Sequence, residues 1–333
     1  MLSIIIEALI KSVLVAFVLL TAFAYLTFAE RKIAALMQVR RGPNRVGPWG
    51  LLQPAADGIK LIFKEEFTPA GADKTLFFLA PILTMIPALV IVAVIPVGPD
   101  VEMFGRTIRL GISDLNVGLL YILAIASIAV YGIVLAGWSS ANKYALLGGL
   151  RASAQMISYE IALGLSIMGP VMLAGTLSLQ GIVLAQQSST WYVVWQPLGA
   201  MIFMVAGLAE LNRAPFDMPE AEQELTAGYF TEYSGMKFSL FFMGEYIKMV
   251  AVSAITTTLF FGGYLGPFIN DFPWLGIFYF AGKTMAFLFL MIWIRLTLPR
   301  LRYDQLMAFG WKILLPLALF NVVITATGIV MFN

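Results

Sequence analysis

The sequence predicts an all-α integral membrane protein, a single polytopic domain over residues 1–333 built as a bundle of eight transmembrane helices plus an interfacial amphipathic helix. Hydrophobic residues make up 60% of the chain and charged residues only 12%, which excludes an ordinary soluble domain. The apolar residues are gathered in runs close to the length of about 20 residues that crosses a bilayer. The first run, residues 4–29, is too long for a cleaved signal peptide, so we expect it to be a retained span.

Eight runs qualify as spans, and the loops between them differ in charge. Sixteen of the 21 Lys and Arg residues fall in or beside the four loops that share one side, whereas the opposite loops hold only Arg106 and Arg109. Because cytoplasmic loops are enriched in Lys and Arg, this asymmetry predicts that both termini face outward. The predicted spans are 4–29, 75–97, 117–138, 154–175, 192–210, 238–264, 276–295 and 309–331.

The first inner loop contains a segment that is too short and too charged to span. Residues 40–50 hold Gly-Pro twice and indicate turns. Over about 51–65, apolar residues then recur at helical spacing while Asp57, Lys60 and Lys64 occupy other faces. This pattern predicts an amphipathic helix in the membrane interface. The alternative is a helix that merely covers the end of the bundle.

The chain contains no Cys and no His. Without thiolate or imidazole ligands, an iron–sulfur cluster, a haem or a structural zinc site is not expected on this chain. We therefore predict no metal site and no catalytic residue here, and any electron carrier should lie on another subunit.

Residues 210–235 interrupt the apolar runs with six of the 19 acidic residues and one cation, Arg213. Pro215 and Pro219 prevent a continuous helix, and aromatic residues alternate with the acids. We predict a loop folded in between the spans, with coupled carboxylates directed toward a cavity. The alternative is a solvated acidic loop. The six acids are Glu210, Asp217, Glu220, Glu222, Glu224 and Glu232.

Ionisable residues inside spans are costly and need a partner or a polar cavity. Glu160 is the clearest case, about 9–12 Å from the inner end of its predicted helix at 1.5 Å per residue. Glu245 and Lys248 are three residues apart and either form an ion pair or relay protons. Lys283 has no acid nearby in the sequence, so we expect a carboxylate on another helix. Glu7 and Lys11 are assigned a structural role.

Five segments resemble one known family over nearly the whole chain, in the same order. They are Ala29 to Lys32, Arg41 to Lys60, Gly137 to Glu160, Glu210 to Glu222 and Arg300 to Met307. The family is that of the H subunit of NADH:quinone oxidoreductase, whose mitochondrial counterpart is subunit 1 of respiratory complex I.

The resemblance implies a quinone-entry channel and the start of a buried carboxylate route for protons. It assigns Glu160, Glu210, Asp217, Glu220 and Glu222 to the proton route, to which we add Glu245. The residues assigned to the quinone channel or the subunit interface are Glu30, Arg31, Asp57, Lys60 and Arg213, to which we add Tyr233.

The resemblance also implies partners. NADH, FMN and iron–sulfur clusters are expected on other subunits of the complex, with quinone as the substrate and a bacterial plasma membrane, rather than a mitochondrial one, as the location. Nucleic acid is not expected as a partner. The alternative is the equivalent subunit of an energy-converting hydrogenase. A free-standing ion-coupled transporter and a membrane scaffold are further hypotheses, which transport by the isolated chain would separate from a complex subunit.

Overall fold

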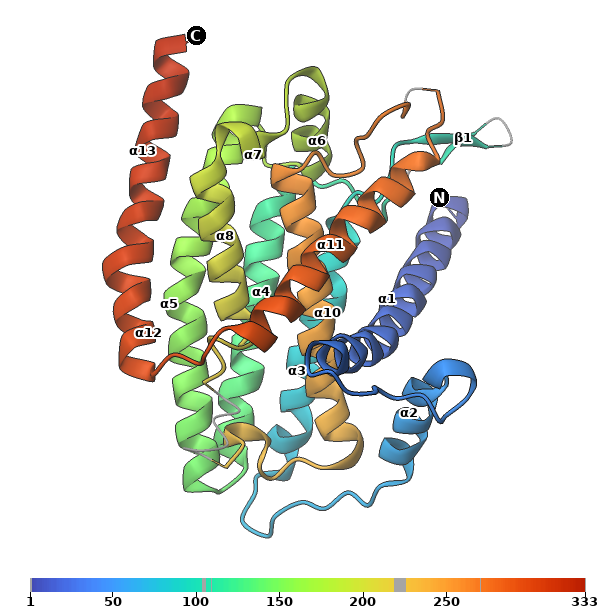
Figure 1. Ribbon diagram of the computed structural model, residues 1–333, viewed down its shortest axis with the longest axis vertical. Helices are drawn as coiled ribbons and strands as arrows, with labels where there is room; N and C mark the ends of the chain where they lie inside the picture. The colour runs from blue at the N-terminus through green and yellow to red at the C-terminus, as the bar shows by residue number, and fades with distance from the viewer. Residues whose placement is uncertain (1, 104–105, 109, 219–225, 270, 333) are drawn as a thin grey trace.

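A bundle of long helices makes up most of the computed structural model, which describes residues 2–103, 106–108, 110–218, 226–269 and 271–332 (Figure 1). The α-helices are α1 (Leu2–Met37), α2 (Gln53–Phe63), α3 (Lys74–Ile91), α4 (Gly118–Ser139), α5 (Lys143–Ala174), α6 (Leu179–Ser188), α7 (Tyr192–Trp195), α8 (Pro197–Glu210), α10 (Gly235–Phe260), α11 (Leu275–Thr297), α12 (Tyr303–Phe309) and α13 (Leu315–Phe332). Short 3-10 turns η1 (Pro48–Gly50), η2 (Val92–Val94) and η3 (Gly228–Phe230), a π-helical turn η4 (Gly310–Leu314), and strands β1 (Val101–Met103) and β2 (Arg106–Ile108) complete it.

The predicted class, a helical membrane protein, is confirmed. Among the described residues, seven helical segments are long and apolar enough to cross a membrane: α1, α3 with η2, α4, α5, α10, α11, and α12 to α13. The predicted fifth span, 192–210, is divided between α7 and α8, and α8 has 14 residues. The count of eight spans and the sidedness of the termini stay predictions, although both chain ends lie toward the same end of the bundle in Figure 1.

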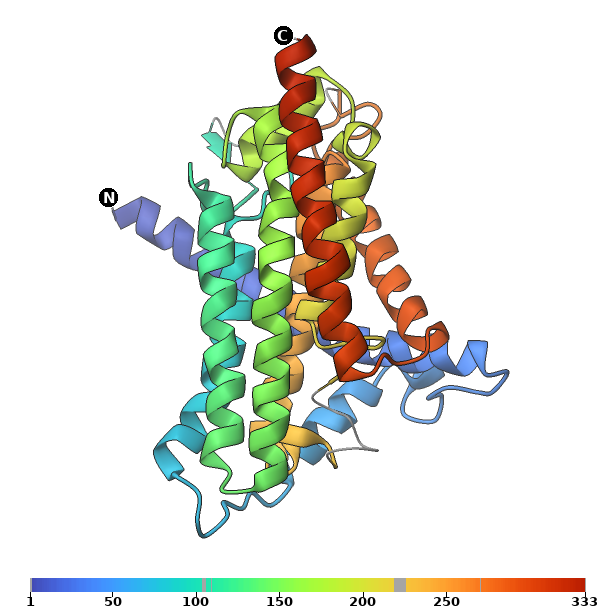
Figure 2. The ribbon, with the colours of Figure 1, turned by 90° about the vertical axis from the view of Figure 1, so that its left-hand side faces the viewer.

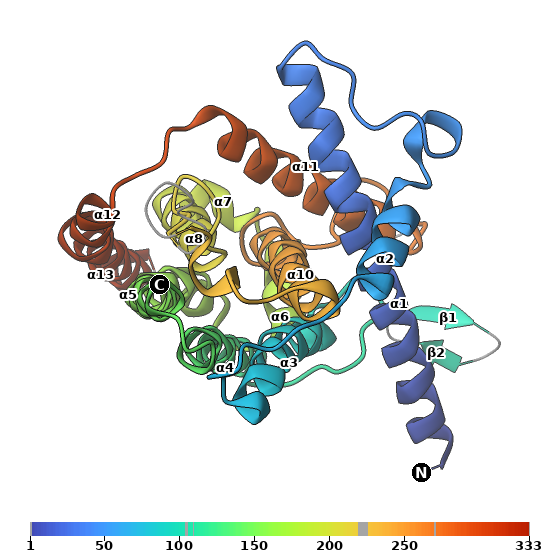
Figure 3. The ribbon, with the colours of Figure 1, turned by 90° about the horizontal axis from the view of Figure 1, so that it is seen from below.

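Helix α10 lies near the centre of the bundle, with α3, α8 and α11 around it, when the molecule is seen from below (Figure 3). Of the 18 consecutive residues that are most apolar in α10, 67% are buried. The same stretch of α1, which extends away from the other helices, is only 11% buried. The bundle is therefore built around α10, and α1 is attached at its edge.

Helices α4 and α5 run side by side for most of their length (Figure 2). Two glycines allow this approach, because a Cβ on Gly149 would lie 3.2 Å from the Cα of Gly137. The side chain of Asn142 accepts a hydrogen bond from the Tyr144 N–H at 2.9 Å and begins α5 at Lys143. The predicted start at residue 154 is wrong, because the charged residues Lys143 and Arg151 belong to the helix and not to the loop before it. Glu160 accordingly lies about 25 Å, rather than 9–12 Å, from the first residue of its helix.

The amphipathic helix is confirmed as α2, although its position at a membrane interface stays a prediction. No residue of α2, which the structure describes throughout, is buried, and Ile62 and Phe63 are 61% and 84% exposed. Helix α1 continues to Met37, eight residues past the predicted end of the first span, so Glu30 and Arg31 are helical. The antiparallel β1–β2 pair and the helices α6 and α12 were not predicted.

Candidate functional site

A cavity of about 510 Å³ lies between α1, α2, α10 and α11. Four of the residues assigned to the quinone channel line it: Glu30, Arg31, Asp57 and Lys60. Apolar side chains, among them Phe23 and Phe242, make up the rest of its wall. The cavity thus combines an apolar wall with charged groups, as expected of a site for an amphipathic ligand.

Helix α2 is tied to α1 through Asp57. The Arg31 Nη1 donates to Asp57 Oδ2 at 2.6 Å, and the Gln53 side-chain amide donates to Asp57 Oδ1 at 3.0 Å. Asp57 is therefore held by both helices at the rim of the cavity.

Glu30 is the centre of a buried ionic cluster on the cavity wall. One of its oxygens accepts hydrogen bonds from Arg213 Nη1 and from the Tyr246 hydroxyl, each at 2.8 Å. The other oxygen contacts Arg295 of α11. The cluster joins α1, the segment after α8, α10 and α11 at one point.

Arg213 connects this cluster to Glu245, the acidic residue of α10. Its Nε pairs with Glu245, and its guanidinium lies 4.1 Å from the centre of the Tyr246 ring. Burial alone would lower the pKa of Arg213, but Glu245, Tyr246 and Glu30 outweigh burial and hold that pKa above its ordinary value. Arg213 is thus a fixed cation between two carboxylates.

The segment from Leu211 to Ser234 is folded in among the helices, since nearly all of its described residues are buried or half-buried. The buried Gln155 side chain donates to the carbonyl oxygens of Ala209 and Phe216, each at 2.7 Å. Phe216 and Met218 are buried, as are Tyr229, Phe230 and Tyr233. The prediction of a folded-in rather than solvated segment is confirmed for these residues.

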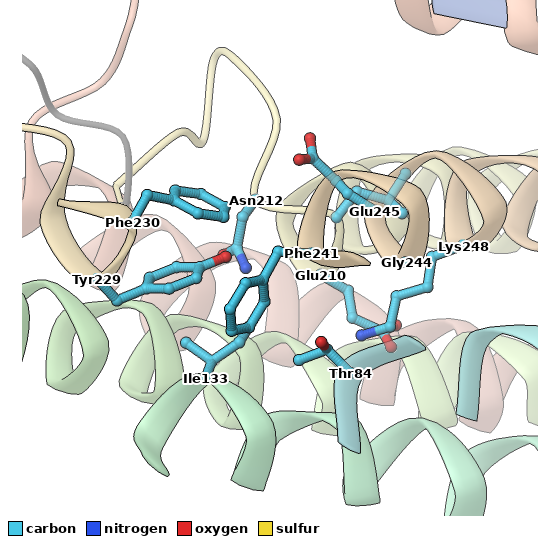
Figure 4. A pocket seen from close by; sticks show the side chains of 11 residues that line it. Thr84, Ile133, Glu210, Asn212, Tyr229, Phe230, Phe241, Gly244, Glu245 and Lys248 are labelled. Atoms are coloured by element: carbon cyan, nitrogen blue, oxygen red, sulfur yellow. The ribbon is translucent and has the colours of Figure 1, made fainter. Parts of the chain in front are cut away.

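Glu210, the last residue of α8, lies beside the buried Lys248 of α10. Figure 4 shows the ammonium group of Lys248 directed toward the Glu210 carboxylate, with Thr84 nearby. Both residues, together with Glu245, line a small cavity of about 30 Å³. Glu245 extends away from Lys248 in Figure 4 and pairs with Arg213. An ion pair with Lys248 was one of the two roles that the sequence left open for Glu245.

The other residues assigned to the proton route are more dispersed. Glu160 contacts the hydroxyl of Ser127, so it is held between α5 and α4. Asp217 is half-buried and does not line the cavities that contain Glu30 or Glu210. Glu220 and Glu222 lie outside the described residues, so their assignments stay predictions, and Glu224, which was not assigned to the route, lies outside them as well.

Two predicted residues have surroundings other than those expected. The Tyr233 ring stacks on Phe77 with centroids 4.1 Å apart, and Tyr233 does not line the cavity that contains Glu30. Burial raises the pKa of Tyr233 to about 12. The predicted carboxylate partner for Lys283 is wrong: its ammonium donates to the carbonyl oxygens of Phe261, Gly263 and Leu265 at 2.7, 3.0 and 2.6 Å. These carbonyls belong to the turn that follows α10, which ends at Phe260.

The sequence reasoning missed Tyr246 and Arg295 as members of the Glu30 cluster. Tyr246 could have been noticed because it lies between Glu245 and Lys248 in a span. Arg295 was counted only as an inner-side cation. Among the described residues, no group of three or more His, Cys, Asp or Glu is placed to hold a metal ion.

The comparisons with known proteins agree on one family. The NADH dehydrogenase family model matches residues 10–326. The chain is 57% identical over 315 residues to an H subunit of the NADH-quinone oxidoreductase of Geobacter metallireducens, covering 95% of this chain and 94% of the relative. The chain belongs to this family.

Two further bacterial relatives also match over most of their length. The H subunit of Protochlamydia amoebophila is 56% identical, with 92% of each chain covered, and that of Rickettsia felis is 53% identical, covering 96% of this chain and 93% of the relative. The family match together with the long apolar helices makes the chain a multi-pass membrane protein of the family of NADH-quinone oxidoreductase H subunits.

Proposed function

We propose that the chain is the membrane subunit of a proton-translocating NADH:quinone oxidoreductase in a bacterial plasma membrane. In this role it forms the quinone-entry channel and the first part of a carboxylate route. The observation that carries the proposal is the position of Arg213, which contacts Glu30 on the wall of the large cavity and Glu245 on the wall of the small one. A change of charge at one cavity therefore alters, through Arg213, the electrostatic potential at the other cavity.

The large cavity suits a quinone. Its volume of about 510 Å³ and its apolar wall can accept a ring with part of an isoprenoid tail. Glu30, Arg295 and Tyr246 supply the polar groups for the ring oxygens. Because α1 contributes part of the wall and is attached at the edge of the bundle, a tail can enter beside it.

The small cavity suits proton transfer. Glu245 and Glu210 both line it and face cations, Arg213 and Lys248. Carboxylates that interact with one another titrate as a coupled group, so a proton gained by one alters the proton affinity of the next. Reduction of a quinone beside Glu30 would change the field at Arg213 and, through it, the protonation of Glu245 and Glu210.

Partner subunits complete the enzyme in this proposal. NADH oxidation and electron transfer through FMN and iron–sulfur clusters take place on those subunits, and this chain supplies no redox group. Its residues bind and orient the quinone and move protons.

The test is Glu210→Gln in the intact complex. We expect NADH:quinone reductase activity and proton pumping to fall at least tenfold, about 1.4 kcal/mol in the barrier, because the amide cannot take up a proton. NADH oxidation with a hydrophilic artificial acceptor should be unchanged, since electrons leave before they reach the quinone. Glu7→Gln, the same change at the far end of α1, is the control and should retain all three activities. Full quinone reduction and full pumping in Glu210→Gln would refute the proposal.

A further inference from the structure

The ammonium group of Lys283 is held by contacts that the proposed function does not use. Lys283 lies in α11 and donates hydrogen bonds to the carbonyl oxygens of Phe261, Gly263 and Leu265. An ammonium group has three N–H donors, so these carbonyls satisfy all of them. The group also lies 4.5 Å from the centre of the Trp191 ring, in a cation–π contact. We call this set of three carbonyls the carbonyl seat.

The main chain that forms the carbonyl seat is fixed by contacts other than those of Lys283. Gly262 and Gly263 have φ of 72° and 56°, in the left-handed region. A Cβ on Gly262 would lie 2.9 Å from the Trp191 ring, so this position requires glycine. The Gly262 N–H donates to the buried Gln186 side chain of α6 at 3.0 Å, and the Gly263 N–H donates to the Thr257 carbonyl at 2.8 Å. Helices α6 and α10 therefore hold the carbonyls in place for a cation.

Helix α11 lies on the surface of the bundle, so its position depends on a small number of contacts. It runs obliquely across the other helices in Figure 1, and only five of its 23 residues are buried. One turn beyond Lys283, the Phe287 ring packs edge to face on Phe261 with centroids 4.9 Å apart. The carbonyl seat and this ring contact together set where α11 lies against the end of α10.

The other end of α11 reaches the large cavity. Arg295 and Leu296 line that cavity, and Arg295 contacts Glu30 on its wall. Lys283 lies about 18 Å before Arg295 along the helix, at 1.5 Å per residue. Because the hydrogen-bonded helix is stiff along its axis, a shift of α11 at Lys283 also moves Arg295.

The contacts of Lys283 differ from those expected of a proton relay. Its three hydrogen bonds go to backbone carbonyls, which accept hydrogen bonds but do not take up a proton near neutral pH. The other buried lysine of this region, Lys248, is directed toward the carboxylate of Glu210 instead (Figure 4). Lys283 is therefore a fixed cation that joins α11 to the turn after α10.

We propose that Lys283 is a positioning residue for quinone binding, which seats α11 on the turn after α10 and so holds Arg295 at the wall of the large cavity. The inference rests on the proposed function, because it takes the large cavity as the quinone site. Lys283 does not line that cavity and acts through Arg295.

The experiment compares Lys283→Met and Lys283→Arg with wild type in the intact complex. Methionine has no N–H donor, whereas the planar guanidinium of arginine keeps the charge but does not match all three carbonyls. Lys283→Met should raise the KM for quinone about tenfold and leave kcat within about twofold of wild type, because a misplaced Arg295 weakens binding. Lys283→Arg should raise that KM about threefold.

Tyr279→Phe is the matched control. It removes another hydrogen bond from α11 to the same loop, which the Tyr279 hydroxyl donates to the Pro267 carbonyl at 2.9 Å. Pro267 lies beside Phe268, which is 71% exposed. Water can replace a hydrogen bond in such surroundings, so the KM for quinone should stay within about twofold of wild type.

A double-mutant cycle separates positioning of Arg295 from a general loss of stability. The readout is the affinity for quinone, measured as KM or, in an inactive variant, by displacement of a fluorescent quinone analogue. In an Arg295→Met background, adding Lys283→Met should change this affinity less than about twofold. A merely structural role would give a similar change in both backgrounds. In cryo-EM maps of Lys283→Met, the Arg295 guanidinium should no longer contact Glu30.

An unchanged KM in Lys283→Met, or an equal rise in KM in both backgrounds, would overturn the proposal. If Lys283→Met does not assemble, Lys283→Arg provides the test, and an unchanged KM in that variant would contradict the proposal. If α11 moves but the affinity for quinone does not change, the carbonyl seat stands and the assignment of quinone to the large cavity fails. If neither changes while Glu210→Gln abolishes pumping, only the role of Lys283 fails.

Discussion

Helices α1 and α10 show opposite relations between composition and burial. The sequence of α1 is the more hydrophobic, yet only 11% of its most apolar window is buried, against 67% for α10. Helix α10 holds Glu245, Lys248 and a run of hydroxyl residues, and it is the centre of the bundle. An apolar sequence is therefore no guide to burial in a membrane protein, because an apolar helix can face lipid or a partner while a helix with polar groups lies inside the bundle.

The buried hydroxyls of α10 are satisfied within the helix. Ser253, Thr256, Thr257 and Thr258 are all 0% exposed, and each donates to the carbonyl oxygen four residues earlier at 2.7–2.9 Å. Side chains of α1 such as Leu9 and Phe17 are 62% and 69% exposed and have no polar group to satisfy. Glu30 fixes α1 to the bundle through its contacts with Arg213, Tyr246 and Arg295.

The largest loss of stability should follow from removal of Arg213, the cation that contacts both α1 and α10. Arg213→Met leaves Glu30 and Glu245 buried without their shared partner, which should destabilise this region by about 3–5 kcal/mol. Amide hydrogen exchange of the intact complex should then show faster opening of the last turns of α1, along with loss of quinone reductase activity.

Arg213→Lys is the matched control for charge. Lysine keeps the cation but lacks the planar fork that reaches two carboxylates, so an intermediate exchange rate is expected. If Arg213→Met exchanges as slowly as wild type, the Glu30 cluster does not fix α1.

A smaller difference in the free energy of unfolding is expected between alanine substitutions of two phenylalanines, one in α10 and one in α1. Phe260 in α10 is 0% exposed and packs on Phe203 with centroids 5.8 Å apart, so Phe260→Ala should cost about 3 kcal/mol through the space it leaves. Phe17→Ala in α1 should change stability by less than about 0.5 kcal/mol. Thermal unfolding of the solubilised complex measures both. A large effect of Phe17→Ala would show that a partner subunit covers this face of α1.

The sequence was sufficient to predict a helical membrane protein, because runs of about 20 apolar residues are typical of transmembrane helices. It was less informative at the helix ends. Glu30 and Arg31 at one end of α1, and Lys143 and Arg151 in α5, looked like loop residues, but contacts within the protein let the helices continue past the apolar runs. The spacing of apolar residues in the sequence does not indicate such contacts.

The candidate site was predicted in its residue types but not in its pairing. Glu30, Arg213 and Glu245 were each singled out, yet their meeting depends on the turn after α8, which brings Arg213 between α1 and α10. The partner of Lys283 was predicted wrongly because its ammonium binds backbone carbonyls after α10, and the types of side chain in the sequence do not reveal such partners.

The smallest effect is expected at the N-terminal end of α1, from Glu7→Gln. Glu7 pairs with Lys11 at 2.5 Å one helical turn away, and the two side chains are 54% and 23% exposed. Exposed pairs of this kind contribute about 0.2–1 kcal/mol in water, far less than the buried contacts of Glu30. Hydrogen exchange in the first turns of α1 should therefore change by less than about fivefold. A larger change would mean that hydrocarbon rather than water surrounds this pair, since the same charges interact more strongly at low dielectric.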